Sequence, residues 1–223
     1  MNQDDLRFFD RDEDFCVFEE RALPHWMQAG TLCFITWRLH DALPGEVYDR
    51  IDREVASLLK SHTIACDETW SEYLSKLDLK TRSQMQWKLF MIRDKFLDQG
   101  WGRCPLREPQ HAEIVLNSLR HFDEDRYFLT DVAVMPNHLH FIAAFQSQDA
   151  MLTQCEAWKR FTGRTVHRME GRRGEFWQVD QFDHLIRSEA QFSHFKKYIA
   201  DNPSQAGLSE GDFLHFHKPL QVE

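Results

Sequence analysis

Residues 126–145 read RYFLTDVAVMPNHLHFIAAF, two apolar runs joined by the turn-forming residues MPN. Both runs are rich in β-branched and aromatic residues, and we interpret them as paired or consecutive strands. A further apolar run, TLCFITWRL at 31–39, is followed by the turn residues DALPG and predicts another strand. A β-sheet is therefore expected at the centre of the protein.

Apolar residues recur at helical spacing in the segments between and after these strands. The helices expected from this spacing cover residues 46–60, 68–79, 82–98, 111–121 and 154–169. Thr153 and Glu156 have the spacing of a capping box at the start of the last of these helices. The block 62–110, which contains two of the helices and a loop rich in Gly and Pro, is interpreted as an insertion.

The segment FWQVDQFDHLIR at 176–187 favours extended structure, although its alternation is weak. Ser188 and Gln191 again have capping-box spacing, and a final helix is expected after them. Pro203 disfavours helical geometry in the residue before it, so this helix is expected to end near Asn202.

The 223 residues are 42% apolar and 28% charged, which is typical of a globular protein and excludes disorder and collagen-like structure. Five scattered cysteines without a C-x-x-C pair indicate neither a disulfide framework nor a thiolate zinc site, so a reducing compartment fits best. No apolar stretch approaches the roughly 18 residues of a membrane span, and the N-terminus is acidic where a signal peptide would be basic. We expect an unanchored cytoplasmic protein.

The net charge of −9 argues against a nucleic-acid partner until its distribution is considered. Residues 1–20 hold eight acidic side chains and two arginines, whereas residues 153–199 hold nine basic and six acidic ones. The acidity is therefore concentrated at the N-terminus, and a locally basic surface is compatible with it.

His138 and His140 are the first candidates for chemistry, because a strand sends residues i and i+2 to the same face. Two imidazoles on one face provide half of a divalent-metal site. An H-x-H pair also arises readily by chance among twelve histidines, as His215 and His217 illustrate. Sheet histidines without a metal are the alternative interpretation.

Tyr198 and Asn202 are four residues apart in the last expected helix, so their side chains would lie on one helix face. An amide oxygen can complete a metal shell begun by two imidazoles, and it suits Mg²⁺ or Mn²⁺ better than a thiolate does. The alternative is structural: Tyr198 would flank the apolar stripe around Phe195, and Asn202 would end the helix.

A basic and aromatic segment, WKRFTGR at 158–164, follows the histidines. Arg160, Arg164 and Arg168 would form one stripe on a helix, a geometry that suits contacts with successive phosphates. A solvated charged face is the alternative.

Four motifs together resemble the single-tyrosine HUH transposases, in particular the group of REP-associated tyrosine transposases. In chain order they are VMPNHLHFIAAF, the WKRFTGR helix, FWQVDQFDHLIR and a helix that ends in KYIADNPSQAGL. The resemblance is strongest over about 126–208 and extends to LPHWMQAGTLCFITWRL near 23–39. It covers neither the acidic N-terminus nor the residues after 209, and the block 62–110 looks like an enlargement within the family's core.

Matched residue by residue, the resemblance implies that His138 and His140 are metal ligands, Tyr198 is the nucleophile and Asn202 is the third ligand. It implies an α+β fold: a ferredoxin-like antiparallel sheet with helices mainly on one face, the histidine strand in the centre, and a helical insertion. The expected organisation is an acidic tail at 1–22, a transposase-like domain at 23–208 with the insertion at about 62–110, and a C-terminal extension at 209–223.

The activity implied is cleavage and rejoining of single-stranded, hairpin-forming DNA, in DNA transposition or the mobilisation of REP elements, by a monomer or homodimer. Tyr198 would attack phosphorus and become joined to the 5′-phosphate, while Mg²⁺ or Mn²⁺ would polarise the phosphate. A free 3′-hydroxyl could then rejoin the strands without ATP, because the phosphotyrosine bond retains the energy of the broken phosphodiester.

DNA contacts are expected beside this catalytic face, from the basic residues of the second half of the chain. They are Lys159, Arg160, Arg164, Arg168, Arg172, Arg173, Lys196 and Lys197. The acidic N-terminal segment is expected to lie elsewhere, or to act as a displaceable mimic of DNA.

Two other functions remain open from the sequence. The first is a domesticated DNA-binding protein that keeps the fold and hairpin recognition but does not cleave. The second is a metal-dependent hydrolase that uses the histidines with a carboxylate, Asp131 or Asp183, and water as the nucleophile.

Overall fold

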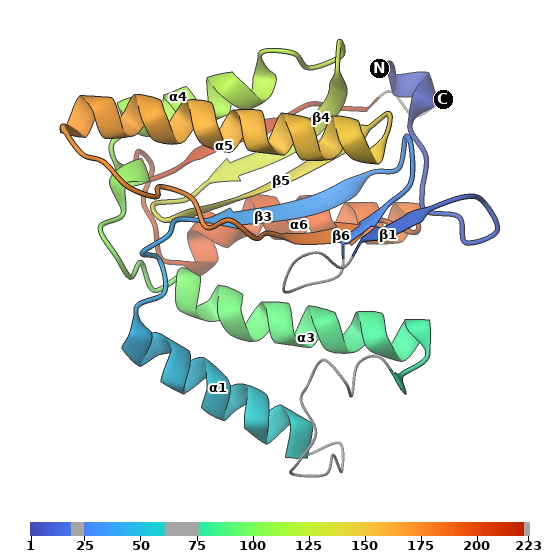
Figure 1. Ribbon diagram of the computed structural model, residues 1–223, viewed down its shortest axis with the longest axis horizontal. Helices are drawn as coiled ribbons and strands as arrows, with labels where there is room; N and C mark the ends of the chain where they lie inside the picture. The colour runs from blue at the N-terminus through green and yellow to red at the C-terminus, as the bar shows by residue number, and fades with distance from the viewer. Residues whose placement is uncertain (19–24, 61–75, 221–223) are drawn as a thin grey trace. The chain divides into compact units, whose positions relative to one another are not determined.

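The computed structural model describes residues 1–18, 25–60 and 76–220 (Figure 1). The chain divides into two compact units, one formed by residues 1–40 and 103–223 and the other by residues 41–102. The first unit contains the sheet and every candidate site residue.

The first unit is built on a five-stranded antiparallel sheet with the strand order β6-β3-β5-β4-β7. Its strands are β3 (Cys33–Arg38), β4 (Tyr127–Val134), β5 (His138–Phe145), β6 (Phe182–Leu185) and β7 (Leu214–His217). Its α-helices are α4 (Pro109–Arg120), α5 (Gln148–Glu170) and α6 (Glu189–Gln205), and a 3₁₀ turn, η2 (Pro105–Arg107), precedes α4. From β3 to β6 the order of elements is ferredoxin-like, with β7 added at one edge. The expected α+β fold is confirmed, and the histidine strand β5 is central.

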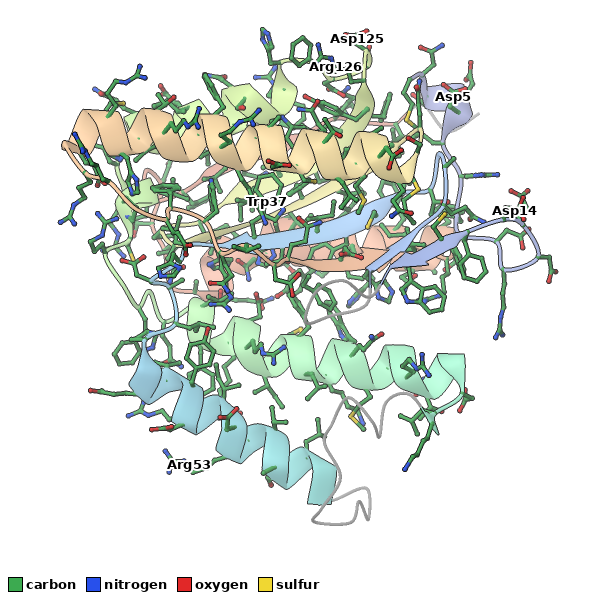
Figure 2. All side chains as sticks on the ribbon, viewed as in Figure 1. Asp5, Asp14, Trp37, Arg53, Asp125 and Arg126 are labelled. Carbon is green, nitrogen blue, oxygen red and sulfur yellow. The ribbon has the colours of Figure 1, made fainter. Side chains whose placement is uncertain are left out.

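Alternation along the strands gives the sheet two faces. On one face, the ring centroids of Trp37 and Phe141 lie 5.9 and 6.0 Å from that of Trp158 in α5. Figure 2 shows Trp37 between the strands and α5. On the other face, Phe34 of β3 stacks on Phe195 of α6 at 4.5 Å. Helices α4 and α5 thus cover one face and α6 covers the other (Figure 1).

Every residue of β4 and β5 is buried, because helices cover both faces of the sheet. This explains why residues 126–145 read as continuous apolar runs and do not alternate with polar residues. The turn between the strands is closed by a hydrogen bond of 2.9 Å from the Met135 amide to the His138 carbonyl. A register shift between Leu129 and Asp131 introduces a bulge into β4.

Helix α5 begins earlier than its sequence predicts. Its N-cap is Ser147, whose hydroxyl accepts a hydrogen bond of 3.1 Å from the Ala150 amide. The capping box expected at Thr153 and Glu156 is therefore wrong, because the orphan amides of the first turn are already served by Ser147 and Thr153 lies inside the helix.

Helix α6 has the predicted start and a different end. The Ser188 hydroxyl accepts a hydrogen bond of 3.2 Å from the Gln191 amide, which confirms the cap. The expected end near Asn202 is wrong, because α6 continues through Pro203 to Gln205. The last turn is held by bonds of 2.9 Å from the Ala206 amide to the Asn202 carbonyl and from the Leu208 amide to the Pro203 carbonyl.

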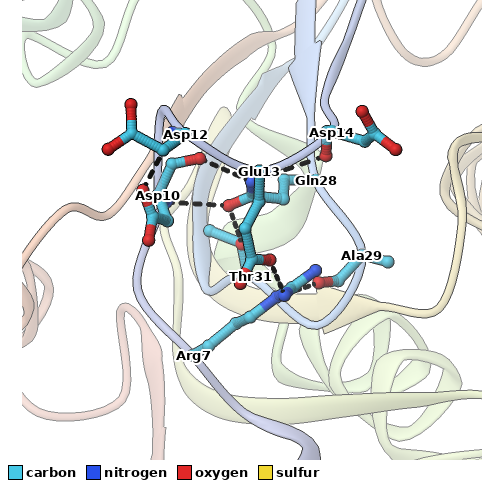
Figure 3. Close-up of polar contacts among 8 residues, drawn as sticks. All are labelled: Arg7, Asp10, Asp12, Glu13, Asp14, Gln28, Ala29 and Thr31. Carbon is cyan, nitrogen blue, oxygen red and sulfur yellow. Dashed lines mark hydrogen bonds and ion pairs between the residues drawn. The ribbon is translucent and has the colours of Figure 1, made fainter.

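The acidic N-terminal residues 1–18 belong to the first unit. Figure 3 shows polar contacts of this segment with Gln28 and Ala29. The Gln28 side chain accepts a hydrogen bond of 2.9 Å from the Asp10 amide and donates one of 2.7 Å to the Asp10 carbonyl. Arg7 forms an ion pair with Glu13 and donates a hydrogen bond of 2.6 Å to the Ala29 carbonyl. The loop thus turns its backbone toward Gln28 while its carboxylates stay exposed. The tail boundary expected at residue 22 falls outside the described residues.

A small hairpin and an aromatic cluster hold the same segment. Strands β1 (Cys16–Phe18) and β2 (His25–Met27) pair antiparallel, and a short 3₁₀ turn, η1 (Gln3–Asp5), precedes them. The Trp26 ring stacks on Phe15 at 5.4 Å and meets Phe9 edge-on at 6.1 Å. The Phe9 amide also donates a hydrogen bond of 2.8 Å to the Ile186 carbonyl.

The second unit is helical, with α1 (Gly45–Lys60) and α3 (Leu79–Leu97). Val55 and Leu58 of α1 pack against Met85 and Leu89 of α3. Because α1 belongs to this unit, the unit begins at Asp41, earlier than the insertion expected at 62–110. The helix expected at 68–79 lies largely outside the described residues.

The two ends of the second unit meet. Gly102 has a φ of +84°, and a Cβ at this position would collide with the Asp41 carbonyl oxygen. Glycine is required here by both the backbone conformation and the close approach of the two chain segments. In the part of the chain that the structure describes, no helix has the length and apolarity needed to cross a bilayer.

Candidate active site

His138 and His140 lie on one face of β5, as the i, i+2 spacing predicts. Both are fully buried, their ring centroids are 4.8 Å apart, and each offers a nitrogen within 4.8 Å of the other's. They share this face with Phe34, whose ring stacks on that of His140 at 5.6 Å. The pair is close enough for both imidazoles to bind one ion.

The Nδ1 atom of each histidine is hydrogen-bonded to a neighbouring side chain. His138 Nδ1 donates to Asn137 Oδ1 at 2.8 Å, and His140 Nδ1 and the Thr36 hydroxyl are 2.7 Å apart. A proton held at Nδ1 leaves a lone pair on Nε2, so the His138 ring is in the tautomer that can bind a metal through Nε2.

Burial keeps both histidines neutral. It lowers the pKa of His138 from 6.5 to about 3, an effect that an interaction with the Asn202 side chain partly opposes. Burial, and secondarily the neighbouring His138, lowers the pKa of His140 well below its ordinary value. Neutral imidazole is the form that binds metals, so the pair is ready for an ion at neutral pH without losing a proton.

Helix α6 brings Tyr198 to the histidine pair. The Tyr198 ring centroid lies 5.5 Å from that of His140 and 5.8 Å from that of Phe34, edge-on in both cases. The side chain is held among these rings and is only 8% exposed. The expected arrangement, with the tyrosine on a helix that faces the histidines, is present.

Asn202 lies on the same helix and is fully buried. Its side chain interacts with His138, while Tyr198, four residues earlier, contacts His140. The i, i+4 spacing therefore aligns one residue of α6 with each histidine of β5.

The donors of this cluster fit a divalent ion. Two neutral imidazoles supply nitrogen ligands, and the Asn202 amide beside them can supply an oxygen ligand. The histidine pair of this face can thus hold a metal ion, with water or substrate oxygens in the remaining positions.

Three further residues complete the surroundings of the histidines. Thr36 and Asn137 fix the two rings, and Arg38 is the cross-strand partner of His138 on β3, so its side chain shares the histidine face. Asn137 was visible in the sequence as the neighbour of His138. Thr36 and Arg38 were not, because only the register of β3 against β5 brings them to the pair.

No family model matches the sequence, and neither does any curated protein. Two solved structures are similar to it. One is a REP-associated tyrosine transposase bound to a REP hairpin. It is 15% identical, with a TM-score of 0.43 over 86% of this chain and 76% of that chain.

The second similar structure is a candidate transposase from Deinococcus radiodurans R1. It is 12% identical, with a TM-score of 0.28 over 83% of this chain and 97% of that chain. Both structures are described as transposases. Because both TM-scores are below 0.5, we base the function on the residues of the site.

The basic residues expected to bind DNA are divided between the two faces of the sheet. Six of them line a groove of about 680 Å³ between α5 and the extended segment 172–181. These are Lys159, Arg160, Arg164, Arg168, Arg172 and Arg173. Phe176 and Trp177 also line this groove, which we call the arginine groove.

Lys196 and Lys197 lie apart from the arginine groove, on α6. Lys196 lies over the Phe192 ring at 5.2 Å, and Lys197 pairs with Asp201 at 2.7 Å. The expectation of one basic surface beside the catalytic face is therefore wrong, because α5 and α6 cover opposite faces of the sheet.

Neither carboxylate considered for a hydrolase lies with the histidine pair. Asp183 is the cross-strand partner of Ile35, on the α5 face. Asp131 is opposite Ile142, so it shares the α6 face, but its Oδ1 accepts a hydrogen bond of 2.8 Å from His217. That carboxylate is thus engaged with β7 and not with the histidines of β5.

Proposed function

We propose that this protein is a metal-dependent single-strand DNA nuclease and strand transferase with Tyr198 as the nucleophile. The observation that carries the proposal is the placement of the Tyr198 ring 5.5 Å from that of His140, in a cluster with a second buried neutral histidine and Asn202. A binding protein needs no such combination of phenol, paired imidazoles and amide.

The site residues have two roles in the proposed reaction, metal binding and nucleophilic attack. His138, His140 and Asn202 would hold a divalent ion, which when bound supplies Lewis-acid stabilisation of charge on the phosphate and the leaving oxygen. Tyr198 attacks phosphorus; as the new O–P bond to the 5′-phosphate forms, the bond to the 3′-oxygen breaks, the phenol gives its proton to water, and the leaving 3′-oxygen takes up a proton from water to become a hydroxyl.

Arg38 is the residue best placed to neutralise the non-bridging phosphate oxygens. Its side chain leaves β3 on the histidine face, in cross-strand register with His138, and the residue is half-buried. A cation at this position stabilises charge that develops in the transition state.

Single-stranded DNA is the substrate class we propose, since an unpaired strand can bend into a site where the nucleophile is only 8% exposed. The phenol has to turn out of its aromatic surroundings to meet a phosphate. The arginine groove, with its rows of cations and the neighbouring exposed Phe161, is proposed as the path of the strand beyond the site.

The test uses labelled single-stranded oligonucleotides, with a REP-type hairpin as the first probe and Mg²⁺ or Mn²⁺ present. We expect a covalent protein–DNA band on a denaturing gel that disappears in Tyr198→Phe and in His140→Ala. Tyr48→Phe, which alters a tyrosine of α1, is the matched control and should keep the band.

Each alternative predicts a distinct result. Tight hairpin binding without a covalent band in the unmodified protein would indicate a DNA-binding protein. Cleavage that persists in Tyr198→Phe would indicate a hydrolase that uses water.

A further inference from the structure

A second His-x-His pair, His215 and His217, lies on β7 at the edge of the sheet. The register of β7 against β4 pairs His217 with Asp131, so all three side chains lie on the α6 face. Phe216 points to the opposite face, where the Arg120 guanidinium lies 4.7 Å from its ring centroid. Both histidines are exposed, unlike His138 and His140.

Asp131 beneath them is a buried carboxylate, with only 2% of its surface exposed. Its Oδ1 accepts the hydrogen bond of 2.8 Å from Nδ1 of His217. Its Oδ2 is buried and has no hydrogen-bond partner among the described residues. A buried carboxylate oxygen without a partner is costly unless positive charge lies nearby, so this position favours a cation.

We propose that His215 and His217 bind one Zn²⁺ ion, with Asp131 as the residue that orients His217. Asp131 accepts a hydrogen bond from Nδ1–H of His217, which keeps the proton on Nδ1 and leaves the Nε2 lone pair available, the arrangement found in carboxylate–histidine–metal triads. His215, two residues away on the same face, supplies the second imidazole. Water completes the four-coordinate shell that zinc prefers.

The site differs from the His138–His140 pair in place and in chemistry. The strands β7 and β5 are separated by β4, which puts the two pairs about 10 Å apart across the sheet. The ligands on β7 are imidazoles and water without an amide, a set that favours zinc over magnesium. An ion here exchanges directly with solvent, because both histidines are exposed.

The test counts zinc on the full chain by equilibrium dialysis against free Zn²⁺ in the low micromolar range, followed by metal analysis. The double variant His215→Ala/His217→Ala should bind one zinc fewer than the unmodified protein. The double variant His40→Ala/His121→Ala removes two other exposed histidines and should bind the same number. The variant His138→Ala/His140→Ala should keep the zinc on β7.

Asp131→Asn tests the orienting role. The amide is isosteric but cannot hold the Nδ1 proton as strongly, and we expect zinc affinity at β7 to fall about 10- to 100-fold. Thermal unfolding of each variant verifies that it is folded.

Equal zinc binding by the β7 double variant and the unmodified protein would overturn the proposal, and so would an equal loss in the His40/His121 control. None of these measurements involves DNA or Tyr198, so the failure of one proposal leaves the other intact.

Discussion

The histidines of β5 illustrate how strongly burial governs the chemistry of a single residue. An exposed histidine titrates near pH 6.5, but burial lowers the pKa of His138 to about 3. Separately from burial, Thr36 and Asn137 form hydrogen bonds with the Nδ1 atoms and so fix the orientations of the two rings. Neutral rings in a fixed orientation are preorganised to bind a metal ion.

Stability should therefore fall in mild acid. Below pH 6.5 the unfolded chain protonates His138 and His140, whereas in the folded chain burial lowers the pKa of His138 to about 3 and that of His140 well below 6.5. The unfolded state then binds more protons, so the free energy of unfolding should decrease by about 1 kcal/mol per pH unit for each histidine. Urea unfolding at pH 7, 6 and 5 with a chelator present measures this slope.

His138→Ala/His140→Ala should have a shallower slope than the unmodified protein, and His121→Ala, on an exposed histidine, should leave it unchanged. Identical slopes in all three proteins would contradict the buried neutral state.

Thr36→Val removes the hydroxyl that holds His140 while keeping the shape of the side chain. Loss of such an orienting partner typically lowers metal affinity about 10- to 100-fold, and we expect this for Mn²⁺ in calorimetric titration. Thr165→Val, on α5, is the matched control. An unchanged affinity in Thr36→Val would show that His140 needs no partner to bind the ion.

At the scale of elements, the N-cap of α6 fixes where the helix begins and therefore which of its residues face β5. Ser188 caps the helix, and Tyr198 and Asn202 follow on one face against β5. Pro203 does not end the helix at Asn202, although it removes one backbone donor. The buried Asn202 side chain beside His138 holds this turn against the sheet. The prediction from Pro203 considered only the preceding residue and not this tertiary contact.

Ser188→Ala and Ser147→Ala remove the N-caps of α6 and α5. Each should cost about 1 kcal/mol in the free energy of unfolding, because one amide of the first turn loses its partner. Only Ser188→Ala is expected to slow covalent attachment of DNA, since only α6 carries Tyr198. Chemical denaturation and the gel assay measure the two effects, and equal slowing in both variants would argue against a specific role of α6.

The elements that the sequence predicted well are those whose local pattern agrees with their tertiary setting. The hairpin of β4 and β5 and the cap at Ser188 were predicted in this way. The strand β7 was missed because LHFH carries no apolar run and exists only by pairing with β4. The expected extended segment 176–187 shrank to β6, Phe182–Leu185, because the residues before it make only an isolated bridge, between Trp177 and Leu39, and otherwise line the arginine groove.

The candidate site was predictable only in part for the same reason. Spacing along one strand and one helix predicts that His138 and His140 share a face and that Tyr198 and Asn202 share a face, whereas their choice as site residues rested on the family resemblance. The placement of Thr36 and the face occupied by α5 depend on the pairing of distant segments, which spacing along the chain does not contain.

At the scale of the whole molecule, charge is separated along the sequence and in the fold. The acidic loop at the N-terminus is anchored through Gln28 and Arg7, and the arginine groove lies along α5. The net charge of −9 therefore does not determine the electrostatic potential at a phosphate in the groove, because salt screens charges that lie more than about 8–10 Å away.

Arg160→Glu/Arg164→Glu should weaken binding of unrelated single strands about equally. The slope of log K against log salt should fall by about 0.7 for each phosphate that the variant no longer neutralises. Arg50→Glu/Arg53→Glu reverses two arginines of α1 and is the matched control. Unchanged affinity and slope in the groove variant, measured by fluorescence anisotropy, would exclude the arginine groove as the DNA path.

The contact between Gly102 and Asp41 brings together the two ends of the segment 41–102. The segment of some sixty residues between Asp41 and Gly102 has its two ends in contact, so we expect its removal or replacement to leave strand order and register in the sheet unchanged. Loop-closure entropy rises only slowly with length, so such an excursion imposes little penalty on the host. The contact between Asp41 and Gly102 therefore marks an insertion site. We expect that a foreign domain can be grafted between these two residues.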